Sequence, residues 1–209
     1  MTTSSSDVTI GSLRDGAGSL RSAGRSPALV ASAVACFALL TWAGARIAVP
    51  LPFTPVPATL QTLAVLCAGL FLGAGGGAAS QVLYLSMGLA GVPVFALPGA
   101  GPAYLLGPTG GYLLGFAAGA WVTGRISGLR RGRRVPTVPL SLLAGSAVIH
   151  ACGLAWLALQ SGKGVAAALV PAPLVLFDLA KIVLAAAIYL GVVRPGRSIG
   201  SPWSRASRP

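Results

Sequence analysis

The sequence predicts an all-α membrane protein with six transmembrane helices and with both termini on the cytoplasmic side. Three observations predict this fold: the chain of 209 residues is 55% hydrophobic, only 9% of its residues are charged, and its mean hydropathy is +0.81. Soluble domains usually carry about 25% charged residues, so an ordinary soluble protein is excluded. The net charge of +12 does not indicate nucleic acid, because the arginines gather at the two ends and in one middle run.

Six apolar stretches are long enough, or nearly so, to be transmembrane helices. They cover residues 27–49, 59–72, 78–92, 106–127, 138–160 and 171–193. The second stretch is short, so we expect it to be tilted, extended or partly re-entrant. Residues 1–26 are polar and are expected to form a disordered cytoplasmic tail. Residues 27–194 then form one six-helix transmembrane domain, and residues 195–209 form a basic cytoplasmic tail.

The basic residues fix the orientation of the six helices. With the N-terminus inside, the cytoplasmic side holds three arginines before residue 26, five at 125–134 and four after residue 193, whereas the outer side holds Lys163 and Arg46. Positively charged residues concentrate in cytoplasmic loops, so both termini are expected to lie inside. The cluster at 125–134 is interpreted as a topology anchor beside anionic membrane lipid.

Two segments on the predicted outer face lack charge and are rich in proline or glycine. Residues 50–57 contain four prolines, and residues 91–107 contain several glycines and prolines. Because proline fixes φ, the first segment should be stiff and extended rather than helical. We interpret the two segments as a lid over a cavity, with Phe53 as a candidate ligand contact. The alternative is that they are only short connectors.

Asp178 is the only acidic residue after Asp15, and it lies in a strongly apolar stretch. Lys181 follows three residues later, so the two side chains share one face of a helix. Charges at hydrocarbon depth are costly and usually face a cavity or a partner. The pattern predicts a buried polar binding spot, in which the two groups pair with each other when no ligand is present. A purely structural ion pair is the alternative.

The predicted fourth helix carries two further features. Gly111, Gly115 and Gly119 recur every four residues and form a flat strip suited to close helix packing in lipid. Thr109 and Gly110 stand at the start of the helix, where backbone N–H groups favour an anionic group such as a carboxylate. Simple helix capping is the alternative. Further candidate ligand contacts are the polar side chains of Gln81, Tyr84 and Tyr112, although a buried Gln is satisfied equally well by a neighbouring helix.

Enzyme and nucleotide functions are not supported by the sequence. The glycine-rich run at 73–77 lacks the Gly-Lys-Ser/Thr ending of a phosphate loop, and no carboxylates or histidines cluster as a metal site requires. Ser146 and His150 are one helical turn apart but have no nucleophile elbow, so His150 is interpreted as a buried or cavity-lining residue. We therefore expect no catalytic residue, metal or cofactor. The polar inventory suits a compact solute with an amide-like or ureido-like head, an anionic end and an apolar body.

Three motifs resemble the BioY family. They are RIAVPLPFTPVPATLQT at 46–62, LLGPTGGYLLG at 105–115 and DLAK at 178–181. The first two are long and specific, and the resemblance covers residues 28–193. BioY proteins are the biotin-specific substrate-binding subunits (S components) of energy-coupling factor (ECF) transporters. The resemblance therefore implies a six-helix S-component bundle in the plasma membrane that binds biotin near its outer face.

The same resemblance implies partners and site residues. A transmembrane coupling protein and two ATP-binding cassette subunits would supply energy, and Ala31 and Ala35 on the first helix would contact the coupling protein. Asp178 and Lys181 match the family's polar pair for biotin. Family members often carry a basic residue before the fourth helix, whereas residues 98–102 have none. The carboxylate partner would then be Lys181, Arg46 or the backbone of Thr109.

Two alternatives remain open at this point. The chain could be an S component for another vitamin or small carboxylate, or a solitary biotin transporter without an ATPase module. A membrane enzyme or a structural membrane subunit is disfavoured, because the first lacks a catalytic cluster and the second has no use for a buried Asp/Lys pair beneath apolar loops.

Overall fold

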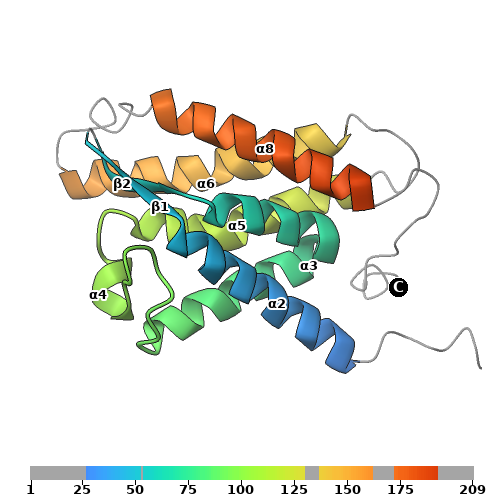
Figure 1. Ribbon diagram of the computed structural model, residues 1–209, viewed down its shortest axis with the longest axis horizontal. Helices are drawn as coiled ribbons and strands as arrows, with labels where there is room; N and C mark the ends of the chain where they lie inside the picture. The colour runs from blue at the N-terminus through green and yellow to red at the C-terminus, as the bar shows by residue number, and fades with distance from the viewer. Residues whose placement is uncertain (1–26, 53, 130–136, 162–171, 193–209) are drawn as a thin grey trace, which may run out of the picture.

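The computed structural model describes residues 27–52, 54–129, 137–161 and 172–192, and helices dominate these ranges (Figure 1). The helices are α2 (Pro27–Arg46), α3 (Gln61–Leu89), α4 (Gly101–Leu105), α5 (Gly110–Leu129), α6 (Thr137–Ser161) and α8 (Ala172–Val192). A two-stranded hairpin of β1 (Ala48–Leu51) and β2 (Thr54–Thr59) follows α2. The predicted tails, the arginines at 130–134, Lys163 and Phe53 lie outside the described residues.

Helix α3 is a helical hairpin that turns at Gly73. Gly73 has φ +78°, a conformation that suits glycine and interrupts the helix. The Gln61 Nε2 and Tyr84 Oη atoms, 23 residues apart, lie 2.6 Å from each other, whereas a straight helix would separate them by about 34 Å. The two limbs therefore correspond to the predicted helices at 59–72 and 78–92. The expected connection between them is wrong, because residues 74–77 are already part of the second limb.

Small residues let the helices pack closely, as the glycine strip predicted. A Cβ atom added to Gly111, Gly115 or Gly119 would lie 3.0 Å or less from atoms of α6. At the hairpin turn, a Cβ on Gly124 of α5 would lie 2.3 Å from the Ala74 nitrogen. Close backbone approach replaces the hydrophobic effect as the source of packing energy inside lipid, so α5 is held between α3 and α6.

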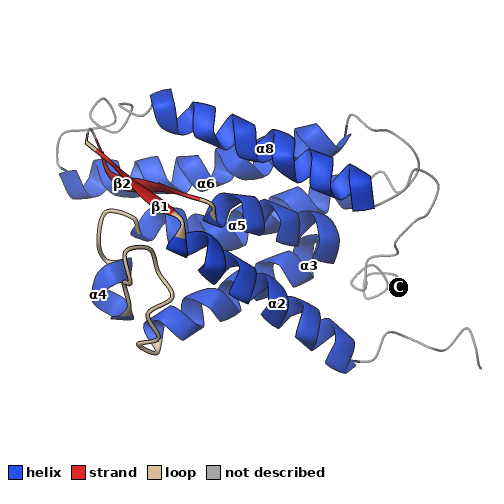
Figure 2. Ribbon diagram, viewed as in Figure 1, coloured by secondary structure: helices blue, strands red, loops and turns tan. Residues whose placement is uncertain are grey.

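The proline-rich segment forms the antiparallel hairpin β1–β2 (Figure 2). This confirms the extended conformation predicted from its prolines and adds a small sheet to the expected all-α fold. Ala48 pairs with Thr59, and the ladder is irregular between Val49 and Leu51, as expected where proline cannot donate. Val56 and Ala58 are buried, so one face of β2 covers the end of the helical bundle.

The second segment of the predicted lid, residues 91–107, is also ordered. Phe95 is fully buried, with its ring edge-on to Tyr84 at 5.7 Å between centroids and stacked on Tyr104 of α4 at 5.0 Å. Arg46, at the end of α2, donates through Nη2 to the Pro93 carbonyl at 2.6 Å. Aromatic packing and this charge-assisted hydrogen bond fix the segment against the bundle.

The surface of the described bundle is suited to lipid. Three of the described helices, α2, α3 and α6 (to Gln160), are long and apolar enough to cross a membrane. Large apolar side chains such as Leu39, Trp121 and Val183 point outward. In Figure 1 the beginning of α2 and the end of α8 lie at one end of the bundle, whereas the β-hairpin and α4 lie at the other.

The limbs of α3 provide a test of this packing. A Cβ on Gly77 would lie 2.9 Å from the Gly69 Cα, so we expect Gly77→Ala to lower stability by about 1–3 kcal/mol through overpacking. Gly128→Ala in α5 is the matched control, because its Cβ would meet open space. Thermal unfolding of the purified protein in detergent measures both variants. Equal melting temperatures for both would contradict the close approach of the two limbs.

Candidate functional site

A cavity lies beneath the β-hairpin at the end of the bundle that also carries α4. The space between its lining atoms, together with open solvent at its mouth, is about 510 Å³. Its walls are formed by Val56, Pro57, Ala58, Thr59, Gln61, Thr62, Ala96, Tyr104, Thr109, Tyr112, Leu113, Phe116, His150, Asp178 and Lys181. Most of this lining is apolar or aromatic, and the charged groups gather at one wall.

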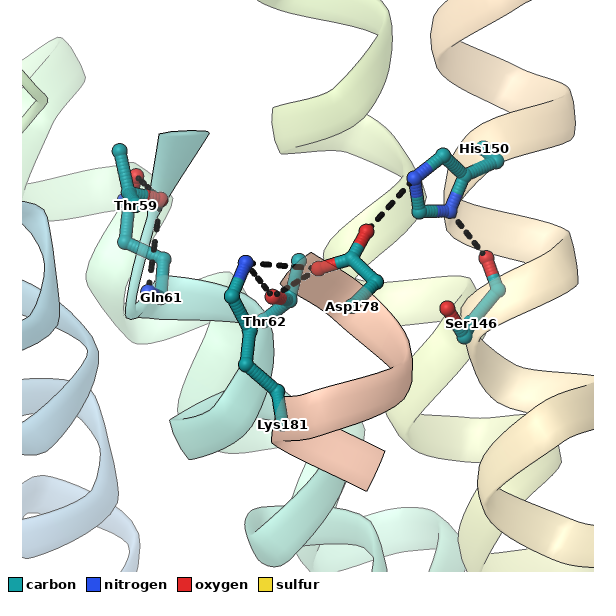
Figure 3. Close-up of polar contacts among 7 residues, drawn as sticks. All are labelled: Thr59, Gln61, Thr62, Ser146, His150, Asp178 and Lys181. Carbon is teal, nitrogen blue, oxygen red and sulfur yellow. Dashed lines mark hydrogen bonds and ion pairs between the residues drawn. The ribbon is translucent and has the colours of Figure 1, made fainter. Parts of the chain in front are cut away.

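That wall is organised around the carboxylate of Asp178 (Figure 3). Lys181 Nζ lies 2.6 Å from Asp178 Oδ1, which confirms the pairing predicted for the empty site. Thr62 of α3 donates its hydroxyl to the same oxygen at 3.1 Å and accepts from Lys181 Nζ at 3.0 Å. Both charged side chains are only 8% exposed. A buried ion pair is tolerated when further hydrogen bonds complete it, and Thr62 supplies them.

His150 of α6 completes the group on the other side. Its Nε2 atom lies 2.7 Å from Asp178 Oδ2, and its Nδ1 atom lies 2.9 Å from the Ser146 backbone oxygen. Figure 3 shows the imidazole between these two oxygens. The edge of the His150 ring also meets Tyr112 of α5, with 5.9 Å between centroids. We call Thr62, His150, Asp178 and Lys181 the Asp178 cluster.

A second set of polar contacts supports the cavity wall at the start of α3. Gln61 lines the cavity, accepts from the Thr59 hydroxyl at 3.0 Å and donates to the Tyr84 hydroxyl at 2.6 Å. Tyr84 in turn donates to the Val94 carbonyl at 3.0 Å. The chain of hydrogen bonds therefore runs from the cavity surface to residues 91–107, the segment that contains Phe95.

The predicted site residues divide into two groups. Asp178, Lys181, Thr109 and Tyr112 line the cavity, as expected of ligand contacts. Gln81 and Tyr84 are fully buried behind its wall: the Gln81 side chain accepts from Thr41 at 3.2 Å and donates to Ser80 at 3.1 Å. Both are satisfied by the protein itself.

The start of α5 differs from the predicted anion site. The Gly110 N–H donates to the Gly107 carbonyl at 3.0 Å, so this amide is already occupied. Trp156 of α6 donates through Nε1 to the same carbonyl at 3.0 Å, and Gln160 donates to the Leu106 carbonyl. A Cβ on Gly110 would collide with the Leu105 oxygen. The turn is thus held to α6, and Thr109 is the residue of this motif that reaches the cavity.

Thr62 and Gln61 were not predicted as site residues, and His150 was predicted without a partner. Thr62 and Gln61 were hidden because nothing in their spacing relates them to Asp178, which lies on a distant helix. His150 was expected to line a cavity, and it does, but its pairing with Asp178 joins α6 to α8. The pairing could have been suspected from composition, because the chain has one histidine and three acidic residues. No group of three or more potential metal ligands occurs among the described residues.

The fold and the cavity together are those of a helical membrane protein with a cavity at one end of its bundle. More narrowly, the chain belongs to the BioY family, whose profile matches residues 21–197.

Individual relatives agree with this assignment. A probable biotin transporter BioY of Pyrococcus horikoshii is 40% identical over 157 residues, covering 75% of this chain and 91% of that protein. A biotin transporter BioY of Thermotoga maritima is 38% identical over 157 residues, covering 74% and 89%. The crystal structure of the S component for biotin from an ECF-type ABC transporter superposes with a TM-score of 0.71 at 24% identity, covering 82% of this chain and 94% of that one. This last similarity confirms the S-component fold.

Tyr84 offers a test of the wall behind the cavity. Tyr84→Phe leaves the Val94 carbonyl and the Gln61 amide without their buried partner, which should cost about 1–3 kcal/mol and lower the melting temperature. Ser86→Ala is the control, because it removes a hydroxyl from the exposed side of the same helix. A Tyr84→Phe protein as stable as this control would show that the buried chain of hydrogen bonds contributes nothing.

Proposed function

We propose that this protein binds biotin in the cavity and acts as the S component of an ECF-type transporter that takes up biotin across the plasma membrane. The observation that carries the proposal is the Asp178 cluster, a buried polar group at one wall of an otherwise apolar cavity. Membership of the BioY family and the names of its relatives as biotin transporters support the choice of ligand.

The chemistry of biotin complements this cavity. Its ureido ring presents two N–H donors and a carbonyl acceptor, its ring system and valeryl chain are apolar, and its tail ends in a carboxylate. Asp178 can accept from the ligand, whereas Lys181 and Gln61 can donate to it. The apolar body would lie against Leu113, Phe116 and the covering face of β2.

The proposed topology has six membrane crossings with both termini in the cytoplasm. In this topology each limb of α3 is a separate membrane crossing. Each limb is too short to span about 30 Å of hydrocarbon unless the bilayer thins or neighbouring protein covers the ends of the limb. The position of the start of α2 and the end of α8 at one end of the bundle supports an even number (Figure 1). The arginine distribution places that end inside, so the cavity opens toward the outside.

Energy would come from a transmembrane coupling protein and two ATP-binding cassette subunits. The proposed contact is the face of α2 around Ala31 and Ala35. Ala31 is exposed and Ala35 is half-buried, and small residues of this kind allow helices to approach closely in lipid.

The first experiment is equilibrium binding of labelled biotin to the purified, detergent-solubilised chain. We expect tight, saturable binding that desthiobiotin competes and thiamine does not. Asp178→Asn should weaken binding by more than about tenfold, because one charge-assisted hydrogen bond is worth about 1.5–3 kcal/mol.

Asp15→Asn is the matched control for this variant. It makes the same chemical change outside the segment that matches the family, 21–197, and should leave the affinity for biotin unchanged. If the Asp178→Asn variant bound biotin with unchanged affinity, Asp178 would not be a ligand contact. Absence of biotin binding to a well-folded wild-type sample would contradict the proposed ligand.

The partner contact is tested separately from ligand binding. Ala31→Trp and Ala35→Trp should abolish biotin uptake in cells that supply the coupling subunits, while leaving biotin binding by the purified protein intact, because a large ring prevents close helix approach. Val183→Trp, on the exposed face of α8, is the control and should preserve uptake. Normal uptake in both alanine variants would exclude this face as the contact.

A further inference from the structure

The imidazole of His150 lies between two oxygen atoms that both accept hydrogen bonds. The Ser146 backbone oxygen, 2.9 Å from Nδ1, is a carbonyl and can only accept, so Nδ1 carries a hydrogen. The Nε2 atom then faces Asp178 Oδ2 at 2.7 Å. Two lone pairs cannot approach so closely in a buried site without repulsion, and a proton must therefore lie between Nε2 and Oδ2.

The remaining contacts of Asp178 decide which atom carries that proton. Lys181 and Thr62 both donate to Oδ1. An ionised carboxylate only accepts, and it is stabilised by several converging donors. Two donors, one of them a cation, already converge on Oδ1, so the carboxylate is the ionised partner and the proton resides on the imidazole. His150 is then an imidazolium hydrogen-bonded at both nitrogens.

We propose that this extra proton on His150 gives the empty Asp178 cluster one net positive charge, and that the charge selects an anionic ligand. One carboxylate faces two cations, Lys181 and the imidazolium, so a ligand with a single negative charge leaves the occupied cavity neutral. This inference rests on the proposed binding of biotin, whose carboxylate would be the anion, and it adds the protonation state on which that binding depends.

The other titratable groups near His150 do not supply or cancel this charge. From α5, the neutral phenol of Tyr112 meets the ring edge, and Tyr104 of α4 lines the same cavity. From α3, the neighbouring side chain is the hydroxyl of Thr62. The guanidinium of Arg46 binds the Pro93 carbonyl and lies over the Trp42 ring, outside the cavity lining. Tyrosine phenols and threonine hydroxyls stay neutral near pH 7.

The charge matters because the cavity is apolar. An uncompensated charge in a poorly solvated site is costly, and an anion brought near it recovers part of that cost through a Coulomb interaction that water screens weakly. A histidine also loses its proton within the range of ordinary buffers. Affinity for an anion should consequently be greatest at low pH and fall as the imidazolium is titrated.

The test compares biotin with its neutral amide, biotinamide, on the full-length protein in detergent. Between about pH 6 and about pH 9, where the carboxylate of biotin stays ionised, we expect biotin affinity to fall by about tenfold or more, as proton linkage requires. Biotinamide affinity should change by less than about threefold over the same range. Parallel pH dependence of the two ligands, or none for either, would overturn the proposal.

His150→Gln keeps a neutral hydrogen-bond donor beside Asp178 and removes the titratable proton. It should abolish the preference of biotin over biotinamide at low pH and flatten the pH profile of biotin. Ser141→Ala is the matched control, because its hydroxyl donates within α6 to Val138 and is not part of the cavity lining. This variant should retain the wild-type profile. An undiminished pH dependence in His150→Gln would assign the proton to another group.

A direct readout is available because His150 is the single histidine in the chain. Histidine-selective nitrogen-15 labelling gives one imidazole spectrum, which should show both ring nitrogens protonated in the empty protein at about pH 6. A neutral ring at that pH would overturn the proposal even if biotin binds tightly. Failure of the ligand assignment gives a different result, namely no binding of either biotin or biotinamide at any pH.

Discussion

The buried carboxylate of Asp178 is the interaction on which the arrangement of this protein depends. It receives hydrogen bonds from Thr62 on α3, His150 on α6 and Lys181 on α8, so one side chain joins three helices that are separated in sequence. In lipid the apolar faces of helices gain little by associating, and a polar group that several helices must satisfy gives their arrangement specificity. The cavity exists where these three helices are held together around a charge.

The cap over the cavity is held by hydrogen bonds outside the Asp178 cluster. Gln61 and Tyr84 link the cavity wall to Val94, and Arg46 ties the end of α2 to Pro93. These contacts are made without a ligand, so the walls are ordered before binding. A preformed cavity avoids part of the entropy cost of ordering loops around a ligand.

Much of this architecture could be predicted from local sequence. The spacing of Asp178 and Lys181, the glycines of α5 and the prolines of the β1–β2 hairpin each constrain a few neighbouring residues, and the structure confirms the local geometry expected of them. Contacts between distant segments could not be predicted in this way. Periodicity within one helix gives no information about which helix lies opposite, so the pairing of His150 with Asp178 and the close approach of Gly77 to Gly69 had no local signal. For the same reason, buried Gln81 could not be distinguished from a ligand contact.

The arrangement also imposes a condition on any ligand. In the empty site Asp178 already accepts from Thr62, His150 and Lys181. A ligand that displaces His150 or Lys181 leaves a buried charge without its partner. A ligand that offered only apolar surface would therefore leave the cluster as it is and gain nothing from it. A ligand with N–H donors can replace one of the hydrogen bonds that Asp178 accepts. If the same ligand also carries an anion, it compensates the positive charge of Lys181 or His150 that loses its contact with Asp178. In the proposed binding mode the cluster favours a molecule that carries both kinds of group, which a single charged residue could not do.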